Sequence, residues 1–274
     1  MPQSQPVIAL LTDFGTSDVY VGIMKGVIAT RCPSARLIDM THEVTAQNIR
    51  QAAYLLRSAY RYFPPHTIFL VVVDPGVGTS RRALAIETDR GTFVGPDNGV
   101  FGGVLEEVDS WQAVVLWTPE GTSATFHGRD LFAPAAAALA SGDPLLKLGV
   151  PTAELFHADP FGAALSKPGQ LAGEVLHIDH FGNVITNLGP FERSGATLLL
   201  NNHEIRLESA SAEITVGTRR ITGICTTYSD LPAGELIALI NSDRQLEIAV
   251  NQGSAARLIN AQLGQAVSLT FKLM

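Results

Sequence analysis

Acidic and basic side chains meet at the end of one apolar run in the first half of the chain. Residues 68–73 are apolar and mostly β-branched, which is typical of a buried strand, and they end at Asp74. A glycine-rich turn then leads to Arg81 and Arg82, followed by a second apolar run at residues 83–86. Catalytic groups often lie at such strand ends in α/β proteins. The alternative is a hairpin with charges at its exposed tip, and these residues alone leave both interpretations open.

Other polar side chains stand at predicted loop positions, and together they could activate a water molecule. Asp13 follows another apolar run, His127 precedes a predicted helix, and Asp179 and Asn183 occupy a loop in the second half. An arginine lowers the cost of a developing hydroxide, while an Asp or His accepts the proton. Taken alone, His127 could equally be a helix-entry residue, and Arg82 is most simply a solvated neighbour.

Three other kinds of chemistry fit the sequence poorly. The turn after Asp74 lacks the Lys of a Walker A loop and the third glycine of a dinucleotide fingerprint. His177 and His180 would face opposite sides of an extended segment, and no HExxH or CxxC motif occurs. There is no G-x-S-x-G elbow, and neither Cys32 nor Cys225 has an obvious activating neighbour. We therefore expect no phosphate loop and no metal site, and we expect both cysteines to remain unlinked thiols.

The first half of the chain alternates predicted strands and helices. Residues 19–30 and 48–62 place apolar side chains at helical spacing, and an Ala-rich helix is predicted at residues 131–140. Apolar runs that predict strands lie at residues 7–11, 35–40, 68–73, 83–86, 92–94 and 114–117. This order favours an α/β domain over residues 1–160, with a mostly parallel central sheet and its working loops at the strand ends.

The second half of the chain has a different sequence pattern. Short β-favouring runs alternate with turns, at residues 173–178, 196–200, 213–216, 236–240, 246–250 and 267–273. No long helical pattern separates them, so we expect a smaller all-β domain, a barrel or sandwich, over residues 170–274. Prolines and glycines in the preceding stretch predict a linker at residues 161–169.

The composition limits the class of protein and its partners. The 274 residues are 46% hydrophobic and 16% charged, so the chain can bury a substantial core. The net charge of -7 argues against a nucleic-acid surface, which needs clustered Lys and Arg. No signal peptide and no apolar run long enough for a membrane span is evident. We expect a cytoplasmic protein that binds a small molecule, with no nucleic-acid or membrane partner.

Seven stretches together resemble the S-adenosylmethionine hydrolases (hydroxide adenosyltransferases), relatives of the fluorinating and chlorinating enzymes that act on the same substrate. The stretches are LLTDFGTSDVYVGIMKG, IDMTHEV, VVVDPGVGTSRRALA, GPDNGVF, FHGRDLFAP, IDHFGNVITNL and LINSDRQLEIAVNQGSAA. They follow the family's order and span nearly the whole chain. The resemblance implies hydrolysis of S-adenosyl-L-methionine to adenosine and L-methionine, by in-line attack of an activated water at C5′.

The resemblance also implies roles for particular residues. Asp74, Arg81 and His127 correspond to the set that activates the water, and which of them accepts the proton stays open. Asp74 and the Val77-Gly78 pair favour water over halide, because halogenating relatives replace this acid. Substrate binding is implied for Asp74 as well and for a further set: Asp13, Asp179, Asn183, Ser242, Glu247 and Val250.

Within that set, the resemblance assigns Asp13 to the ribose hydroxyls, Asp179 to the methionine ammonium and Asn183 to the adenine edge. Ser242 would contact the methionine end, and the backbone near Val250, with Glu247 as a weaker candidate, would contact the adenine. Asp243 stands where halogenating relatives have an arginine, which leaves the methionine carboxylate without an assigned partner.

No metal or organic cofactor is implied, and the family expectation is a homotrimer with sites between subunits. Two alternatives stay open: a halide-dependent adenosyltransferase that forms 5′-halo-5′-deoxyadenosine, and a non-catalytic sensor of adenosine or S-adenosylmethionine.

Overall fold

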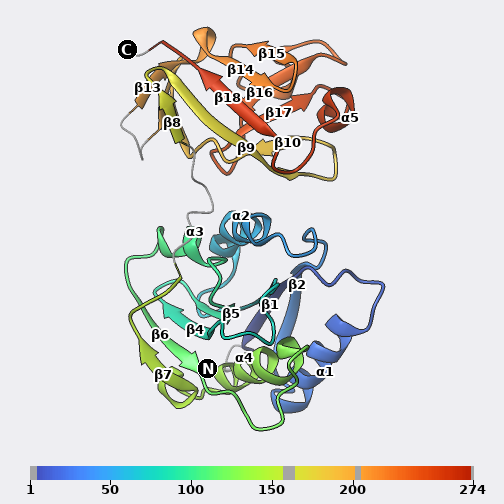
Figure 1. Cartoon of the computed structure of the whole chain (residues 1–274), viewed down its shortest axis with the longest axis vertical. Coiled ribbons are helices and arrows are strands. Elements are labelled where there is room, and N and C mark those ends of the chain that lie inside the picture. Colours follow the sequence, from blue (N-terminus) through green and yellow to red (C-terminus); the bar gives the residue numbers. More distant parts are fainter. Residues whose placement is uncertain (1–4, 157–163, 201–204, 273–274) are drawn as a thin grey trace. The chain divides into compact units, whose positions relative to one another are not determined.

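The chain forms two compact units, Met1–Pro160 and Phe161–Met274. The computed structural model describes residues 5–156, 164–200 and 205–272, and Figure 1 shows the chain coloured along its sequence. No helix of these residues combines the length and the hydropathy that a membrane-crossing helix needs.

The first unit is built on a seven-stranded sheet with the strand order β2-β1-β3-β5-β4-β6-β7. The strands are β1 (Val7–Thr12), β2 (Arg36–Thr41), β3 (Ile68–Val72), β4 (Ala83–Thr88), β5 (Thr92–Pro96), β6 (Trp111–Leu116) and β7 (Gly149–Thr152). Strands β2, β1, β3 and β5 pair in parallel, whereas β4 pairs antiparallel with both β5 and β6, and β6 with β7. The sheet is therefore mixed, and the predicted mostly parallel sheet is corrected in this respect. The physical reason is the tight turn between β4 and β5, in which Thr88 N donates to the carbonyl of Gly91 and the chain reverses.

The strand directions bring distant parts of the sequence to one edge of the sheet. Strands β1, β2, β3 and β5 end at this edge. Strand β6 runs in the same direction as β5, since both are antiparallel to β4, and β4 begins at this edge for the same reason. The two apolar runs around Asp74 and Arg81 do not form a hairpin, because β5 lies between β3 and β4. Residues 73–82 instead form a connection across the end of β5, which we call the 73–82 loop.

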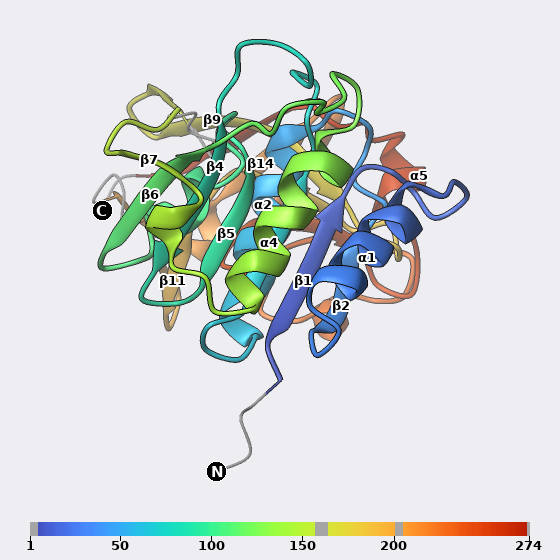
Figure 2. The same cartoon turned by 90° about the horizontal axis from the view of Figure 1, so that it is seen from below.

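Helices cover both faces of this sheet, as Figure 2 shows, with α1 and α4 on one face and α2 on the other. The helices are α1 (Tyr20–Arg31), α2 (Ile49–Ala59), α3 (Gly102–Leu105) and α4 (Ala133–Ala140). Alternate residues of β1 enter the two cores, because neighbouring side chains of a strand point to opposite faces. Ile8 packs with the α1 and α4 side, and Ala9 packs with the α2 and α3 side. Helix α2 begins at Asn48, whose side chain accepts a hydrogen bond from the backbone of Gln51.

The second unit consists mainly of antiparallel strands around a single apolar core. Its eight-stranded sheet has the order β15-β14-β18-β9-β10-β17-β16, with β8 paired to β9, and a three-stranded sheet has the order β11-β12-β13. The strands are β8 (Ala164–Lys167), β9 (Gln170–Ile178), β10 (Val184–Thr186), β11 (Phe191–Ser194), β12 (Thr197–Leu200), β13 (Ile205–Glu208), β14 (Glu213–Val216), β15 (Arg219–Thr222), β16 (Leu236–Ile240), β17 (Leu246–Val250) and β18 (Ala266–Thr270). The short helix α5 (Ala255–Ile259) follows β17.

The predicted linker differs from the structure in its second half. Residues 161–163 lie outside the described part of the chain, but residues 164–167 form strand β8 and pair antiparallel with β9. The linker prediction is therefore wrong for these residues, because Pro168 and Gly169 form the turn of a hairpin there. Of the strand predicted at residues 267–273, residue 273 also lies outside the described part.

The aromatic core on the α2 face yields a stability prediction. Phe69 is fully buried, stacks on Phe93 with ring centroids 4.9 Å apart and meets Tyr60 and Phe63 edge-on. We expect Phe69→Ala to lower the free energy of unfolding by about 3–5 kcal/mol, because the cavity cannot close completely. Urea denaturation of the whole chain measures this, with Tyr62→Ala as the control, since Tyr62 is 74% exposed and should change stability by less than about 0.5 kcal/mol. Equal losses in the two variants would contradict the expectation.

Candidate active site

A carboxylate and a guanidinium form a bidentate ion pair within the 73–82 loop. Arg81 Nε donates to Asp74 Oδ1 at 2.8 Å, and Arg81 Nη2 donates to Asp74 Oδ2. Only 5% of the Asp74 side chain and 11% of the Arg81 side chain are exposed. The guanidinium also lies over the Phe132 ring, 5.2 Å from its centroid. The planar fork of arginine fits both carboxylate oxygens at once, which fixes the orientation of each group.

His127 contacts Arg81 of this pair and comes from a different part of the chain. It lies at the start of a π-helical turn, Gly128–Phe132, that leads into α4. Its Nδ1 is 2.7 Å from Arg81 Nη2. Because arginine can only donate, Nδ1 must accept, and we infer that the neutral ring carries its proton on Nε2.

Burial and the neighbouring arginine favour this neutral form of His127. Burial of the ring lowers its pKa from the usual value, and the positive charge of Arg81 lowers the pKa further. The negative charges of Asp74 and Asp130 act in the opposite direction without reversing the shift. The ring is therefore uncharged over a wider pH range than an exposed histidine.

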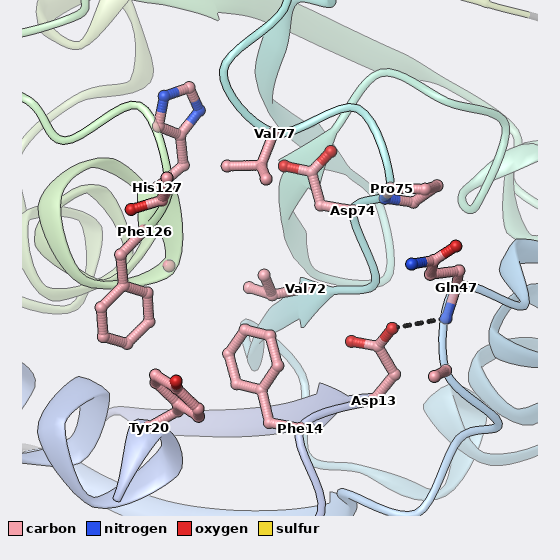
Figure 3. A pocket seen from close by; sticks show the side chains of 13 residues that line it. Asp13, Phe14, Tyr20, Gln47, Val72, Asp74, Pro75, Val77, Phe126 and His127 are labelled. Carbon is pink, nitrogen blue, oxygen red and sulfur yellow. Dashed lines mark hydrogen bonds between the residues drawn. The ribbon is translucent and has the colours of Figure 1, made fainter.

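Asp74 and His127 line a cavity of about 380 Å³ at the sheet edge, and Asp13 lines its opposite part. Figure 3 shows Asp74 and His127 at one end of the cavity and Asp13 at another. Asp13 directly follows β1, and its Oδ2 accepts a hydrogen bond from the backbone of Gln47 at 2.7 Å. The structure thus brings Asp13, Asp74 and His127 to one cavity, whereas Arg81 contacts Asp74 without lining the cavity itself.

Three aromatic rings form a wall of this cavity that sequence reasoning missed. Phe14, Tyr20 and Phe126 line it and contact one another, with ring centroids 5.3–6.1 Å apart. Phe14 directly follows Asp13, and Phe126 directly precedes His127. Their positions next to predicted site residues were a usable signal. Tyr20 carried no comparable signal, because it lies in the first turn of α1.

In the second unit, Asp179 and Asn183 form one compact turn after β9. Asp179 Oδ1 accepts from the backbone of Phe181 at 2.9 Å and of Asn183 at 2.8 Å, and Oδ2 accepts from Asn183 Nδ2 at 2.9 Å. These bonds fix the orientation of both side chains. Oδ1 thus accepts two hydrogen bonds, whereas Oδ2 accepts one and keeps a second lone pair that could accept from a ligand cation.

The other three predicted residues lie on or beside β17 of the same unit. Ser242 is exposed in the loop before β17, Val250 ends that strand, and Glu247 is only 4% exposed within it. Glu247 Oε1 accepts a 2.7 Å hydrogen bond from Tyr228. Burial raises the pKa of Glu247, and the charges of nearby Asp179 and Asp243 act in the same direction. Tyr228 is 43% exposed and is a further residue of this group that the sequence did not single out.

The predicted site residues therefore fall into two groups, one in each unit. Arg82 is outside both, because it forms an ion pair with Asp97 and is 35% exposed. In the described part of the chain, no three His, Cys, Asp or Glu side chains are grouped as metal ligands would be.

Comparisons with known proteins match both units. Residues 8–149 match the SAM hydroxide adenosyltransferase N-terminal domain, and residues 173–268 match the SAM hydroxide adenosyltransferase C-terminal domain. An (R)-S-adenosyl-L-methionine hydrolase of Thermus thermophilus is 38% identical over 96% of this chain and 98% of its own length. A fluorinase of Actinopolyspora mzabensis is 27% identical over 97% of this chain and 98% of its own length. A solved structure of an uncharacterized conserved protein from Thermotoga maritima superposes with a TM-score of 0.83 at 37% identity, covering 96% of this chain and 99% of that one.

The environment of His127 gives a titration prediction. We expect its ring to titrate below the usual pKa of 6.5 and to show the Nε2-protonated tautomer in NMR spectra of the labelled chain. Since the folded pKa lies below the unfolded one, the contribution of His127 to stability is fully present above about pH 6.5 and is lost as the pH falls from there through the lowered folded pKa. Arg81→Gln should raise this pKa by removing the nearby positive charge. A wild-type pKa at or above 6.5 would contradict the inferred environment.

Proposed function

This chain belongs to the SAM hydroxide adenosyltransferase family, and we propose that it hydrolyses S-adenosyl-L-methionine to adenosine and L-methionine. The observation that carries the proposal is the hydrogen-bonded set of Asp74, Arg81 and His127 at one end of a cavity that Asp13 also lines. A ribose held by Asp13 would lie within the same cavity as the groups that could activate a water.

The sequence left open which of Asp74, Arg81 and His127 accepts the proton of the attacking water. We propose that Asp74 accepts it. His127 Nδ1 is occupied by Arg81, and its Nε2 carries a proton, so the neutral ring can donate to a water but has no free nitrogen to accept. Asp74 gives one lone pair of each oxygen to Arg81 and retains others for the water. A weak base is sufficient, because the water becomes strongly acidic as its oxygen bonds to carbon.

The reaction balances without any other group. The water oxygen forms a bond to C5′ while the C5′–S bond breaks, and its electron pair returns to sulfur. The sulfonium becomes a neutral thioether in L-methionine, and the proton passes from the attacking water to Asp74 and then to solvent. The guanidinium of Arg81 stabilises the hydroxide character that develops on the attacking oxygen. Alignment of one water with the C5′–S bond supplies the remaining advantage over bulk water.

The other predicted residues complete the proposal. Asp13 would accept two hydrogen bonds from the ribose hydroxyls, Asp179 would bind the ammonium group of the methionine, and Asn183 would bind the adenine edge. Ser242, Glu247 and Val250 would border the same ligand. Four further points stay predictions: a cytoplasmic location, a homotrimer with sites between subunits, a barrel or sandwich architecture for the second unit, and a reaction without metal or cofactor.

The names of the relatives indicate which epimer of the substrate to expect, and the cavity lining indicates which nucleophile to expect. Because several relatives are named (R)-S-adenosyl-L-methionine hydrolases, at 32–38% identity, we propose the R epimer at sulfur as the preferred substrate. Val77 lines the cavity near Asp74 and offers a halide ion no hydrogen bond, which supports water as the nucleophile.

Product analysis tests the reaction directly. We expect the purified chain to release equimolar adenosine and L-methionine, with one oxygen-18 atom in the adenosine when the reaction runs in labelled water. The R epimer should react faster than the S epimer. A chloride-dependent 5′-chloro product would favour the halide-dependent alternative, and tight adenosine binding without methionine release would favour the sensor.

Substitutions in the triad test the assigned roles. We expect Asp74→Ala to reduce kcat by about a hundredfold or more, because the proton acceptor is lost, while adenosine still binds. Arg81→Lys should also be slow, by about tenfold or more, since a lysine cannot reproduce the fork that contacts Asp74 and His127 together. Steady-state kinetics and adenosine calorimetry measure both effects. Near-normal turnover by Asp74→Ala would remove this residue from the mechanism.

A further inference from the structure

Two of the sequence stretches that carry the family resemblance contain no residue with an assigned role. They are IDMTHEV, which begins within β2 and continues beyond its end, and GPDNGVF, which begins within β5 and continues beyond its end. Both strands end at the edge of the sheet where the cavity lies. We propose that each stretch is a positioning clamp for one half of the active site: Asp97 and Asn98 fix the loop that bears Asp74 and Arg81, and His42 fixes the turn that bears Asp13. This inference rests on the proposed function for the roles of the clamped groups.

The first clamp holds the 73–82 loop at both of its ends. Asn98 Nδ2 donates to the carbonyl of Val73 at 2.9 Å, directly before Asp74. Asp97 accepts from Arg82 Nε at 2.8 Å, directly after Arg81. The backbone N–H of Asp97 donates to the carbonyl of Arg82 at 2.9 Å as well. Two adjacent residues of one turn thus secure the segments on either side of the catalytic pair.

The first clamp also reaches Arg81 itself, through the carbonyl of Arg82. The Arg82 carbonyl that accepts from the Asp97 backbone also accepts from Arg81 Nη1 at 3.3 Å. The Asp97 side chain is only 5% exposed, and its second oxygen accepts from the backbone of Phe156 at 2.8 Å. Hydrogen bonds to a buried carboxylate are strong and costly to leave unmade, so the clamp is well suited to hold its loop rigidly.

The second clamp holds the Thr12–Gly15 turn from both sides of Asp13. His42 is 4% exposed, and its Nδ1 lies 2.9 Å from Thr12 Oγ1. The carbonyl of His42 accepts from the backbone of Gly15 at 2.8 Å. Gly15 has a φ of +66°, a conformation that favours glycine, so the turn is fixed in a shape that few residues allow.

A short chain of contacts orients the His42 ring. Its Nε2 lies 3.0 Å from Asp39 Oδ1, although the contact is not aligned as a hydrogen bond, and Asp39 Oδ2 accepts from Lys25 Nζ at 2.7 Å. Proximity of Nε2 to a carboxylate favours a proton on Nε2, which leaves Nδ1 to accept from the Thr12 hydroxyl. The ring thereby bridges Thr12 to a charged pair on α1 and β2.

The two clamps should affect different steps. The first one orients the groups that act on the water, so loosening it should lower kcat and leave adenosine binding nearly unchanged. The second one orients the group that would hold the ribose, so loosening it should weaken adenosine binding and leave kcat at saturation nearly unchanged. A residue that only contributes to folding would not produce opposite patterns of this kind.

The experiment compares Asn98→Ala with His42→Leu in the whole chain. For Asn98→Ala we expect kcat to fall about tenfold to a hundredfold, as displacements near 1 Å produce, with an adenosine Kd within about threefold of wild type. For His42→Leu we expect the Kd to rise about tenfold, with kcat within about threefold. His42→Asn restores a polar group near the Nδ1 position and should recover most of the affinity. If His42→Leu does not fold, Thr12→Val removes the same contact from its other side and should raise the Kd in the same way.

Thr67→Val is the matched control. Thr67 directly precedes β3, at the opposite end of that strand from Asp74, and its buried hydroxyl donates to the carbonyl of Pro64 at 2.7 Å. The substitution removes one buried hydrogen bond from the same unit, and Thr67 contacts neither clamp. We expect it to lower stability and to leave both kcat and Kd within about twofold of wild type. Proportional changes of both constants in Asn98→Ala and His42→Leu, or changes no larger than in Thr67→Val, would overturn the clamp assignment.

A readout without turnover separates this inference from the proposed function. In Asn98→Ala the looser loop should weaken the contact between Arg81 and His127, so the pKa of His127 measured by NMR should rise toward its usual value. Thr67→Val should leave that pKa unchanged. If the wild-type chain released no methionine, the proposed function would fail, yet this titration would still decide whether the first clamp exists. An unchanged His127 pKa in Asn98→Ala would overturn it.

Discussion

The contact between Arg81 and Asp74 determines most of what this site can do. Burying two charges is costly, and the cost is recovered only when geometry is good and the remaining hydrogen bonds are made. Here the guanidinium uses Nε and Nη2 for Asp74, Nη2 also for His127, and Nη1 for a backbone carbonyl. Its face rests on Phe132. One side chain therefore sets the orientation of the carboxylate and the tautomer of the imidazole.

The contact of Arg81 with His127 limits which side chain of the site can accept a proton. An imidazole nitrogen that accepts from an arginine cannot also accept a proton from water, so the proposed mechanism gives the basic role to the carboxylate. The same arginine disfavours protonation of His127 and lowers its pKa, in addition to the effect of burial. The chemical roles thus follow from donor and acceptor limits more than from residue type, because a His beside an acid would ordinarily be assigned as the base.

The sheet explains how groups from distant parts of the sequence meet. Asp13, His42, Asp74 and Asp97 follow four strands that end at one edge, and Arg81 precedes a strand that begins there. The groups proposed to react and the residues proposed to hold them therefore share the loops at one edge of the sheet. The second unit fixes its own polar groups, since Asp179 bonds to Asn183 four positions away and Tyr228 bonds to Glu247, which is 19 positions further along the chain.

The sequence by itself determined the features that depend on local pattern. Apolar periodicity located strands β1 to β6 and helices α1, α2 and α4 of the first unit, but it missed the short strand β7 and the short helix α3. Asp74 and Arg81 are only seven positions apart, so one turn could be expected to bring them together. The motifs in order also sufficed to identify the family, and the names of the relatives agree with it.

Only the tertiary structure decided which strands are neighbours and which way they run. Strand β5 lies between β3 and β4, so residues 73–82 form a loop and the hairpin that the sequence left open does not occur. The sheet predicted to be mostly parallel is mixed, because β4 pairs antiparallel with β5. The tertiary structure also extended the second unit over residues 164–167, where a linker was predicted. Strand pairing joins residues far apart in sequence, so no local pattern records it. For the same reason, the aromatic wall and the partners of Asp97, Asn98 and His42 became visible only when the loops were placed side by side.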